Sequence, residues 1–400
     1  MRSFKLLLFA LLTVSHNCLA VGFGFEYQSV RASARGNVST AGFSDASMLH
    51  YNPAALIHAT APELALNTFF PNGTVSYENN GSNFDTEEGW LTSGSLFYSH
   101  PFEWQNRKYA LGAGIRIPYG QKITWPDQVP FSTNGISAEM VHIEYLIGGA
   151  IEIGKGLSLG ANLSFATSEL SSRTALSPSP FLVTQGFEGD DTAWGYQIAL
   201  HHQITNSFSW GLTYRSGYDL TYEGSSTISP AVAPISPPLP ATFPTTSDLS
   251  FPDHWTIGCE WQATPKLSLG LQAQRITWSV VENFNVSALG TTQVSPVDWQ
   301  NVWLLSAGAT YQLLPSLDLH LGYLYSDSII NEPYPTPLNT DFDQHFLSLG
   351  FTWRNGSWTT DLSVVRVMQA KKEVTNSNYG FSGNHNSNGW LVNAGISKVF

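Results

Sequence analysis

The chain has 400 residues, and its 30 Asp and Glu against 18 Lys and Arg give a formal net charge of −12. This acidic balance argues against a nucleic-acid partner. Charged residues make up only 12% of the chain, about half of the roughly 25% typical of soluble domains, while 13% is aromatic and 34 residues are glycine. A soluble protein of this size needs more surface charge, so the composition disfavours that class.

Residues 1–20 have the features of a secretory signal peptide. Two cations, Arg2 and Lys5, precede an apolar run, and the small residue Ala20 marks the expected cleavage site. The run is too short to remain as a helical anchor across a bilayer. Cleavage leaves 16 cations against 30 acids, a net charge of −14, with Cys259 as the single cysteine. No disulfide within one chain is therefore expected.

Residues 21–62 show no strand alternation and include a short apolar stretch, residues 45–57. Its start at Asp45 predicts a helix, which Asn52 and Pro53 end. A residue before proline is disfavoured in the α region, and proline donates no backbone hydrogen bond. We interpret Asn52, Pro53 and the small Ala54 as the turning point of a compact segment that plugs another part of the molecule.

From residue 63 onward, apolar and polar residues alternate with the period of a β-strand. In residues 109–117 one parity is apolar, whereas the other carries Gly112, Gly114 and Arg116. No run of 18 apolar residues follows the signal peptide, which excludes helical membrane spans. A soluble β-sandwich is disfavoured by the low charge. The chain is therefore predicted to be all-β, a transmembrane antiparallel β-barrel.

About fourteen alternating segments can be counted, and short turns alternate with long polar or proline-rich loops between them. An outer-membrane barrel with short periplasmic turns and long external loops has this alternation. Fourteen strands enclose a lumen that wall side chains cannot fill, so we expect residues 21–62 to form a hatch inside a barrel of residues 63–400. The segments lie near residues 63–77, 91–102, 108–118, 138–153, 156–168, 192–204, 207–223, 250–263, 266–280, 299–313, 316–328, 343–354, 357–370 and 388–400.

Several motifs resemble FadL-type outer-membrane transporters of long-chain fatty acids and other hydrophobic compounds. The resemblance rests on "RASARGNVSTAGFSDASMLHYNPAALI", "GLTYRSGYDLTYEG", "LSLGLQAQRITWS" and "HFLSLGFTW", and it covers essentially the whole mature chain. It implies a barrel plugged by an N-terminal hatch in a Gram-negative outer membrane, in contact with outer-membrane lipid and lipopolysaccharide. It also implies passive uptake by loop capture, lumen binding and hatch-controlled release, with long-chain fatty acids as the leading cargo.

The resemblance directs attention to the third and fourth external loops. The third offers the apolar residues Phe181, Leu182 and Val183, and the proline-rich fourth offers Leu239 and Phe243. Apolar side chains exposed outside a cell are costly unless they bind something. The alternative is that these residues pack on one another and close the barrel mouth.

Arg116 and Arg215 are the candidate anchors for a fatty-acid carboxylate, because strand parity places both in the lumen. A charge-assisted hydrogen bond is stronger at low dielectric than in water. Either arginine can instead pair with a lumen acid such as Glu144, Asp219 or Glu260. If both are paired in this way, a neutral hydrocarbon becomes the expected cargo.

Gly112 and Gly114 of the third predicted strand are candidates for a lateral opening, because glycine weakens strand pairing. They can equally make room for the hatch. His201 and His202 point to opposite faces of a strand and cannot chelate one metal together. No catalytic, phosphate-binding or metal-ligand motif is recognisable, so we predict no enzyme activity, cofactor or metal site. A lipid-acting barrel enzyme and a general porin or surface adhesin remain the alternative functions.

Overall fold

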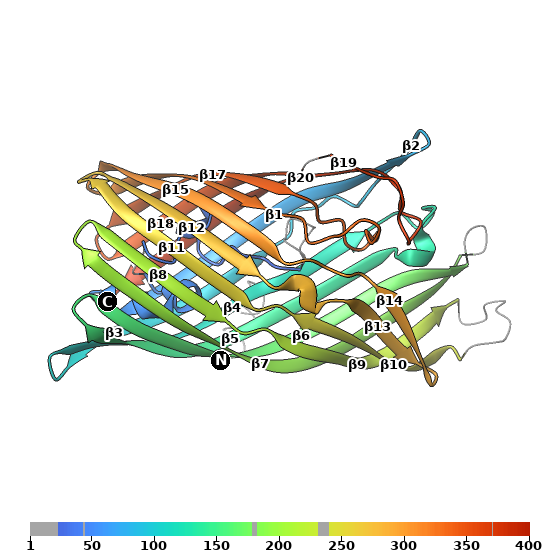
Figure 1. The fold of residues 1–400 in the computed structure, drawn as a ribbon, viewed down its shortest axis with the longest axis horizontal. Helices are drawn as coiled ribbons and strands as arrows, with labels where there is room; N and C mark the ends of the chain where they lie inside the picture. Colours follow the sequence, from blue (N-terminus) through green and yellow to red (C-terminus); the bar gives the residue numbers. More distant parts are fainter. Residues whose placement is uncertain (1–22, 43–44, 178–181, 231–239, 370) are drawn as a thin grey trace.

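The computed structural model describes residues 23–42, 45–177, 182–230, 240–369 and 371–400. These residues form a closed antiparallel β-barrel of 14 strands with the N-terminal segment inside it, which confirms the predicted fold class (Figure 1). Ten strands are continuous: β1 (Glu63–Asn79), β3 (Ser93–Trp104), β4 (Arg107–Thr124), β5 (Ser137–Gly154), β6 (Leu157–Ser177), β7 (Val183–Thr205), β16 (Leu317–Ser326), β17 (Gln344–Asn355), β18 (Trp358–Gln369) and β20 (Gly383–Val399).

The other four strands of the described barrel each consist of two segments in line. They are β8 (Phe208–Arg215) with β9 (Tyr218–Ser229), β10 (Thr242–Phe251) with β11 (His254–Thr264), β12 (Leu267–Ile276) with β13 (Asn283–Ala288), and β14 (Thr291–Pro296) with β15 (Val302–Leu314). Two short strands, β2 (Ser82–Asp85) and β19 (Lys372–Val374), add to the external ends of β1 and β20.

The barrel closes where β1 pairs with β20, from Glu63 opposite Val399 to Glu78 opposite Asn384. Closure leaves no terminal strand of the described sheet without a neighbour, as a lipid environment requires. Side chains alternate across the wall, so Leu111, Ile147 and Trp194 are exposed on the outer face. Across the described residues, no helix has the length and apolarity needed to cross a membrane. The carboxyl terminus lies at the barrel end that carries the β3–β4 turn, which we take as periplasmic (Figure 1).

Four neighbouring strands are interrupted at the same level of the wall. Each break lies between the two segments of a two-part strand, and the strand registers place the breaks side by side. Pro252 lies at one break, where it donates no ladder hydrogen bond, and the carboxylate of Asp253 accepts from the Gly217 N–H at 2.7 Å. Trp278 and Trp299 lie in two other breaks, where both rings are buried and pack against Phe23 of the N-terminal segment.

The break between β8 and β9 overturns one expectation about the lumen. Simple alternation from Arg215 predicts that Asp219 also faces the lumen, but Asp219 is exposed and Leu220 and Tyr222 are buried. The strand is interrupted at Ser216 and Gly217, so the inward parity changes by one residue beyond them. Asp219 is therefore not a lumen acid.

The described part of the N-terminal segment contains three short helices, α2 (Val30–Ser33), α3 (Met48–Tyr51) and η1 (Pro53–His58). We call the described residues from 23 to 62 the hatch. Its backbone approaches the wall so closely that a side chain could not be accommodated at several inward-facing glycines. A Cβ atom would collide with the hatch at Gly160, Gly211, Gly308, Gly322 and Gly350.

Candidate functional site

The turn at Asn52 joins two parts of the hatch to the wall. The Asn52 side chain is fully buried; its Oδ1 accepts from the Ala54 N–H at 3.1 Å. Its Nδ2 donates to the carbonyl of Thr40 at 2.8 Å and to that of Leu200 on β7 at 3.1 Å. Pro53 begins η1, and the carbonyl of Ala54 accepts from the Ser158 hydroxyl of β6 at 2.8 Å. The short apolar stretch therefore lies inside the lumen and is held there by specific hydrogen bonds.

The hatch has an apolar side and a polar side. On the apolar side, Leu49, Leu56 and Ile57 share a buried cluster with Phe97 and Leu146 of β3 and β5. This contact excludes water and needs no directional partners.

The polar side faces the opposite part of the wall. Arg35 donates to both carboxylate oxygens of Glu260 on β11 at 2.8 and 3.0 Å. Gln272 on β12 accepts from the backbone N–H groups of Ser39 and Thr40, each at 3.1 Å. Contacts of this kind fix the orientation of the hatch, because each depends on distance and angle.

Arg116 is held in an internal ion pair. Its Nε and Nη2 donate to Glu144 Oε2 at 2.9 and 2.6 Å, and both side chains are 1% exposed. The second Glu144 oxygen accepts from the Tyr218 hydroxyl at 2.8 Å. His50 of the hatch contacts Arg116 through Nδ1. Burial, followed by the nearby Arg116 and Arg215 guanidiniums, lowers the pKa of His50 well below its ordinary value, so this imidazole is neutral and accepts from Arg116.

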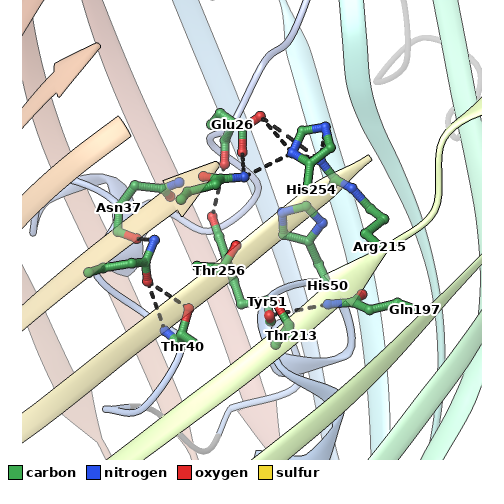
Figure 2. Close-up of a pocket in the computed structure, with 12 residues that line it drawn as sticks. Glu26, Asn37, Thr40, His50, Tyr51, Gln197, Thr213, Arg215, His254 and Thr256 are labelled. Carbon is green, nitrogen blue, oxygen red and sulfur yellow. Dashed lines mark hydrogen bonds and ion pairs between the residues drawn. The ribbon is translucent and has the colours of Figure 1, made fainter. Parts of the chain in front are cut away.

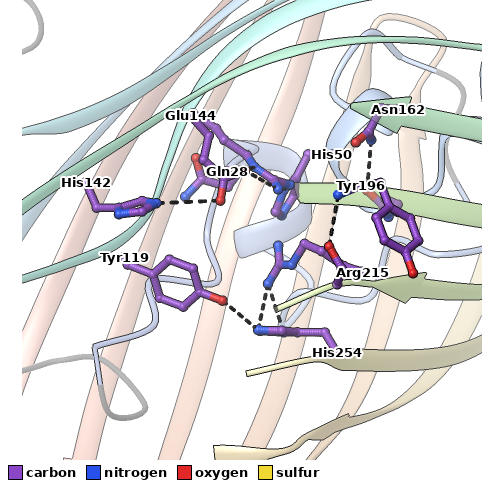
Figure 3. Close-up of polar contacts among 12 residues, drawn as sticks. Gln28, His50, Tyr119, His142, Glu144, Asn162, Tyr196, Arg215 and His254 are labelled. Carbon is purple, nitrogen blue, oxygen red and sulfur yellow. Dashed lines mark hydrogen bonds and ion pairs between the residues drawn. The ribbon is translucent and has the colours of Figure 1, made fainter. Parts of the chain in front are cut away.

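Arg215 is engaged in a second network at the hatch–wall interface. Its Nη2 lies 2.8 Å from His254 Nδ1 and 3.9 Å from a carboxylate oxygen of the hatch residue Glu26. Tyr119 contacts the other imidazole nitrogen of His254 at 2.9 Å (Figure 3). Gln274 donates to Glu26 at 3.0 Å. Arg215, His254, Glu26 and Gln274 border a cavity of about 20 Å³ between hatch and wall (Figure 2), which is room for about one water molecule.

A larger cavity lies on the external side of the hatch. It has a volume of about 360 Å³, within the size range of small-molecule sites. Phe23 of the hatch, Met140, Leu170, Leu249 and Phe284 contribute apolar surface, and the polar remainder is mostly amide and hydroxyl groups. Among the described lining residues Asp248 is the only charged group.

Sequence reasoning did not identify this cavity. Its lining comes from residues between Phe23 and Tyr379, on strand ends and loops that are far apart along the chain. Met140 and Leu170 are individually ordinary members of alternating strands, so no local signal marks them as neighbours of one cavity.

The predicted loop residues are only partly within the described chain. Val183 and Phe243 are buried, with 3% and 5% of their surface exposed, and pack with Ile228 in a small cluster of their own. Leu182 is half-buried. Phe181 and Leu239 lie outside the described residues. The arrangement of Val183 and Phe243 matches the mouth-packing alternative, and a capture role for the loops stays a prediction.

The third barrel strand, β4, loses regular pairing on the external side of Gly112 and Gly114. Its ladder with β3 ends at Ile115, and its register with β5 shifts between Arg116 and Tyr119. Hatch backbone fills the gap: the Phe25 N–H donates to the carbonyl of Pro118 at 2.7 Å, and the Gly120 N–H donates to that of Phe23 at 2.9 Å.

The two candidate glycines lie below this gap. A Cβ on Gly112 would contact Leu49 of the hatch, and one on Gly114 would collide with the Phe97 ring. Both glycines therefore relieve crowding inside the lumen, while the interruption itself lies a few residues further along β4.

The enzyme alternative requires a hydroxyl, a histidine and an orienting acid in contact. Thr310 lies 2.9 Å from His320 Nδ1, and Thr352 lies 2.8 Å from Nε2. In a nucleophile triad the acid orients the histidine itself. Here Asp361 contacts Thr352 and is paired with Arg31 of the hatch, so it does not orient His320. In the described part of the chain, no group of three or more His, Cys, Asp or Glu side chains is arranged to hold a metal.

Comparison with known proteins adds independent findings. A family model described as "Outer membrane protein transport protein (OMPP1/FadL/TodX)" matches residues 11–400. Outer membrane protein P1 of Haemophilus influenzae is 22% identical over 291 residues, which cover 65% of this chain and 62% of that relative, less than two thirds of its length.

Solved structures that share the fold include the following two. A Pseudomonas aeruginosa FadL homologue superposes with a TM-score of 0.84 at 16% identity, covering 95% of this chain and all of the other. The toluene transporter TodX of P. putida gives a TM-score of 0.73 at 17% identity, covering 94% and 99%. The resemblance found in the sequence and the outer-membrane location are confirmed. Because the family model spans nearly its whole length, the chain belongs to the OMPP1/FadL/TodX family of outer-membrane transport proteins.

Proposed function

We propose that this protein is a passive channel that admits uncharged hydrophobic small molecules through the outer membrane. The observation that carries the proposal is the external cavity of about 360 Å³, which is partly apolar and is bordered by Phe23 of a hatch that packs against the lumen wall. A molecule that enters from outside meets this cavity first. The hatch blocks a straight aqueous path, which distinguishes the barrel from a general porin.

The state of the two arginines favours an uncharged cargo over a long-chain fatty acid. Arg116 is bonded to Glu144, and Arg215 contacts His254 and Glu26. A carboxylate would have to displace one of these partners, and breaking a buried ion pair costs about 3–5 kcal/mol. The described lining of the external cavity offers Asp248 and no cation. Hydrocarbons and other neutral compounds need neither to displace these arginine partners nor to find a cation in the cavity. The name of the toluene transporter TodX, a protein of the same fold, is compatible with such a cargo.

The interruption in β4 supports lateral release into the membrane. Between Ile115 and Gly120 the backbone partners of β4 include hatch residues, not only neighbouring strands. Withdrawal of residues 23–28 would free these groups and open the wall at this level. In this proposal Gly112 and Gly114 accommodate the hatch, and Asn52, Pro53 and Ala54 hold it closed.

The test is uptake by proteoliposomes that contain the purified barrel. The uptake rate of toluene, or of a long-chain alcohol, is compared with that of a fatty acid. The alcohol and the fatty acid have the same chain length. Ala175→Trp fills the external cavity, and Ala161→Trp is the matched control because Ala161 lies on the outer face of the same strand, β6. We expect faster uptake of the neutral compounds than of the fatty acid, at least a tenfold loss for Ala175→Trp and no loss for Ala161→Trp. Preferential uptake of the acid would reverse the assignment of cargo, and unchanged uptake in both variants would remove the cavity from the pathway.

A further inference from the structure

Two histidines from distant parts of the chain meet at the periplasmic end of the lumen. His58 is the last residue of η1 in the hatch, and His201 faces it from β7. His58 Nε2 and His201 Nδ1 are 3.0 Å apart, and the ring planes are inclined at 63°. The neighbouring His202 packs instead against Trp210, with ring centroids 6.1 Å apart. The pair therefore joins the hatch to the wall across 143 positions of sequence.

His58 and His201 both line a polar cavity of about 220 Å³. The β7–β8 turn borders this space, which places it on the periplasmic side. Its lining supplies oxygen atoms from Gln203, Ser209 and Gln262. Amide and hydroxyl oxygens of this kind, together with water, can complete the coordination of a metal that two imidazoles hold.

Hydrogen bonding defines the tautomer of His201. Its Nε2 lies 3.2 Å from the carbonyl oxygen of Ala41, which can only accept a hydrogen bond. The proton of the neutral ring is therefore on Nε2, and Nδ1 presents a lone pair toward His58. A metal-bound histidine commonly donates its second ring N–H to a backbone carbonyl in this way.

His58 supplies the second ring nitrogen of the pair. A neutral imidazole is the species that ligates a metal. Without metal, His58 Nε2–H donates to His201 Nδ1. When a metal binds, that proton moves to His58 Nδ1, and the ring remains neutral.

The spacing of the two nitrogens is compatible with chelation of one metal ion. Two metal–imidazole bonds of about 2.0–2.1 Å place their nitrogens about 2.9 Å apart at a right angle and about 3.3 Å apart at the tetrahedral angle. The observed 3.0 Å is close to the right-angle value, which tetragonal Cu(II) and Ni(II) sites prefer. We propose that His58 and His201 form a two-nitrogen site for Cu(II) or Ni(II) that ties the hatch to the barrel wall.

A metal at this site would stabilise the closed hatch. It binds only when η1 lies against β7, so its binding free energy adds to that of the closed arrangement. The inference is independent of the transported cargo, because the site lies on the periplasmic side of the hatch and the external cavity on the other.

The experiment titrates Cu(II) into purified, metal-stripped full-length barrel in detergent and records the electron paramagnetic resonance spectrum. We expect a bound copper with couplings to two imidazole nitrogens in the wild type. His58→Gln and His201→Gln should each weaken its binding at least tenfold and remove one coupled nitrogen. His202→Gln is the matched control, because His202 adjoins His201 but lies on the other face of the strand, and it should bind as the wild type does.

A second measurement needs no variant. Ni(II) should slow the chemical modification of His58 and His201 by diethylpyrocarbonate, read by mass spectrometry, and leave the exposed His100 unaffected. Copper affinity that is equal in all four proteins would overturn the proposal. So would the absence of a two-nitrogen signal in the wild type, or equal protection of His100 and His58.

Discussion

Arg116 and Glu144 lie directly opposite each other on β4 and β5, and the guanidinium donates two hydrogen bonds to one carboxylate oxygen of Glu144. The pair closes the lumen wall beside the hatch, since His50 contacts the same guanidinium. A residue that sequence parity nominated as a ligand anchor is therefore already neutralised by the protein itself.

Removing one member of this pair should destabilise the barrel strongly. Arg116→Gln leaves Glu144 buried without its cation, and we expect a loss of about 3–5 kcal/mol in the free energy of unfolding. The double variant with Glu144→Gln should recover most of that loss, because no buried charge remains unpaired. Urea unfolding followed by tryptophan fluorescence measures both. Equal losses in the single and double variants would contradict this account of the pair.

Asn52→Ala should loosen the hatch and leave the wall intact. The substitution removes three hydrogen bonds, each worth about 0.5–1.5 kcal/mol, and leaves the carbonyls of Thr40 and Leu200 without the Asn52 donor. Hydrogen exchange should accelerate in residues 45–58 and stay unchanged in the strands. The matched control, Asn376→Ala, changes an exposed external residue and should have no effect. Faster exchange throughout the strands would mean that the turn supports the folding of the wall.

The closed position of the hatch should depend on the inward-facing glycines of the wall. A side chain on Gly322 would collide with backbone atoms of Arg35 and Gly36. Gly322→Val should therefore displace the hatch in the full chain and admit small hydrophilic solutes in a liposome-swelling assay. A chain that lacks residues 21–60 should form a heat-resistant barrel, pass those solutes already, and tolerate Gly322→Val without further change. A truncated barrel that excludes hydrophilic solutes would show that the hatch is not the barrier.

Opening of the hatch should become easier as the pH falls. Burial, then Arg116 and Arg215, holds the pKa of His50 well below its ordinary value. Glu144 and His254 also act on His50, and the net effect keeps the enclosed imidazole neutral. A hatch that releases His50 to water lets it bind a proton below about pH 6.5.

The open state then gains up to about 1.4 kcal/mol for each pH unit below that value. Hydrogen exchange of residues 45–58, corrected for intrinsic rates, should show greater opening at pH 5.5 than at pH 7.5. His50→Gln should reduce this dependence, whereas His100→Gln, which changes an exposed residue, should preserve it. An unchanged slope in His50→Gln would assign the effect to another group.

Much of the barrel could be predicted from local sequence. Alternation with a period of two residues marks a strand wherever one face meets lipid and the other the lumen, and this is true of each strand separately. The Asn52-Pro53 turn is equally local, because proline restricts its own backbone and that of its predecessor. Strand number, the hatch and the inward position of Arg116 follow from such signals.

The position of Asp219 shows where local reasoning stops. Side chains alternate predictably between the lumen and the outer face only while a strand is continuous. The break at Ser216 and Gly217 turns Asp219 outward. Pro252 hints at an interruption in the neighbouring strand, yet a proline does not reveal how many residues the bend consumes.

Only the tertiary structure decided which inward side chains meet. Glu144 pairs with Arg116 because the register of β4 and β5 places them opposite, and His58 reaches His201 because the hatch folds back against β7. The external cavity likewise joins strand ends and loops from most of the chain. Alternation determines which face of the wall a residue occupies, because that depends on its own backbone. Its partners depend on register and on the path of the hatch, which are set by the packing of the whole barrel.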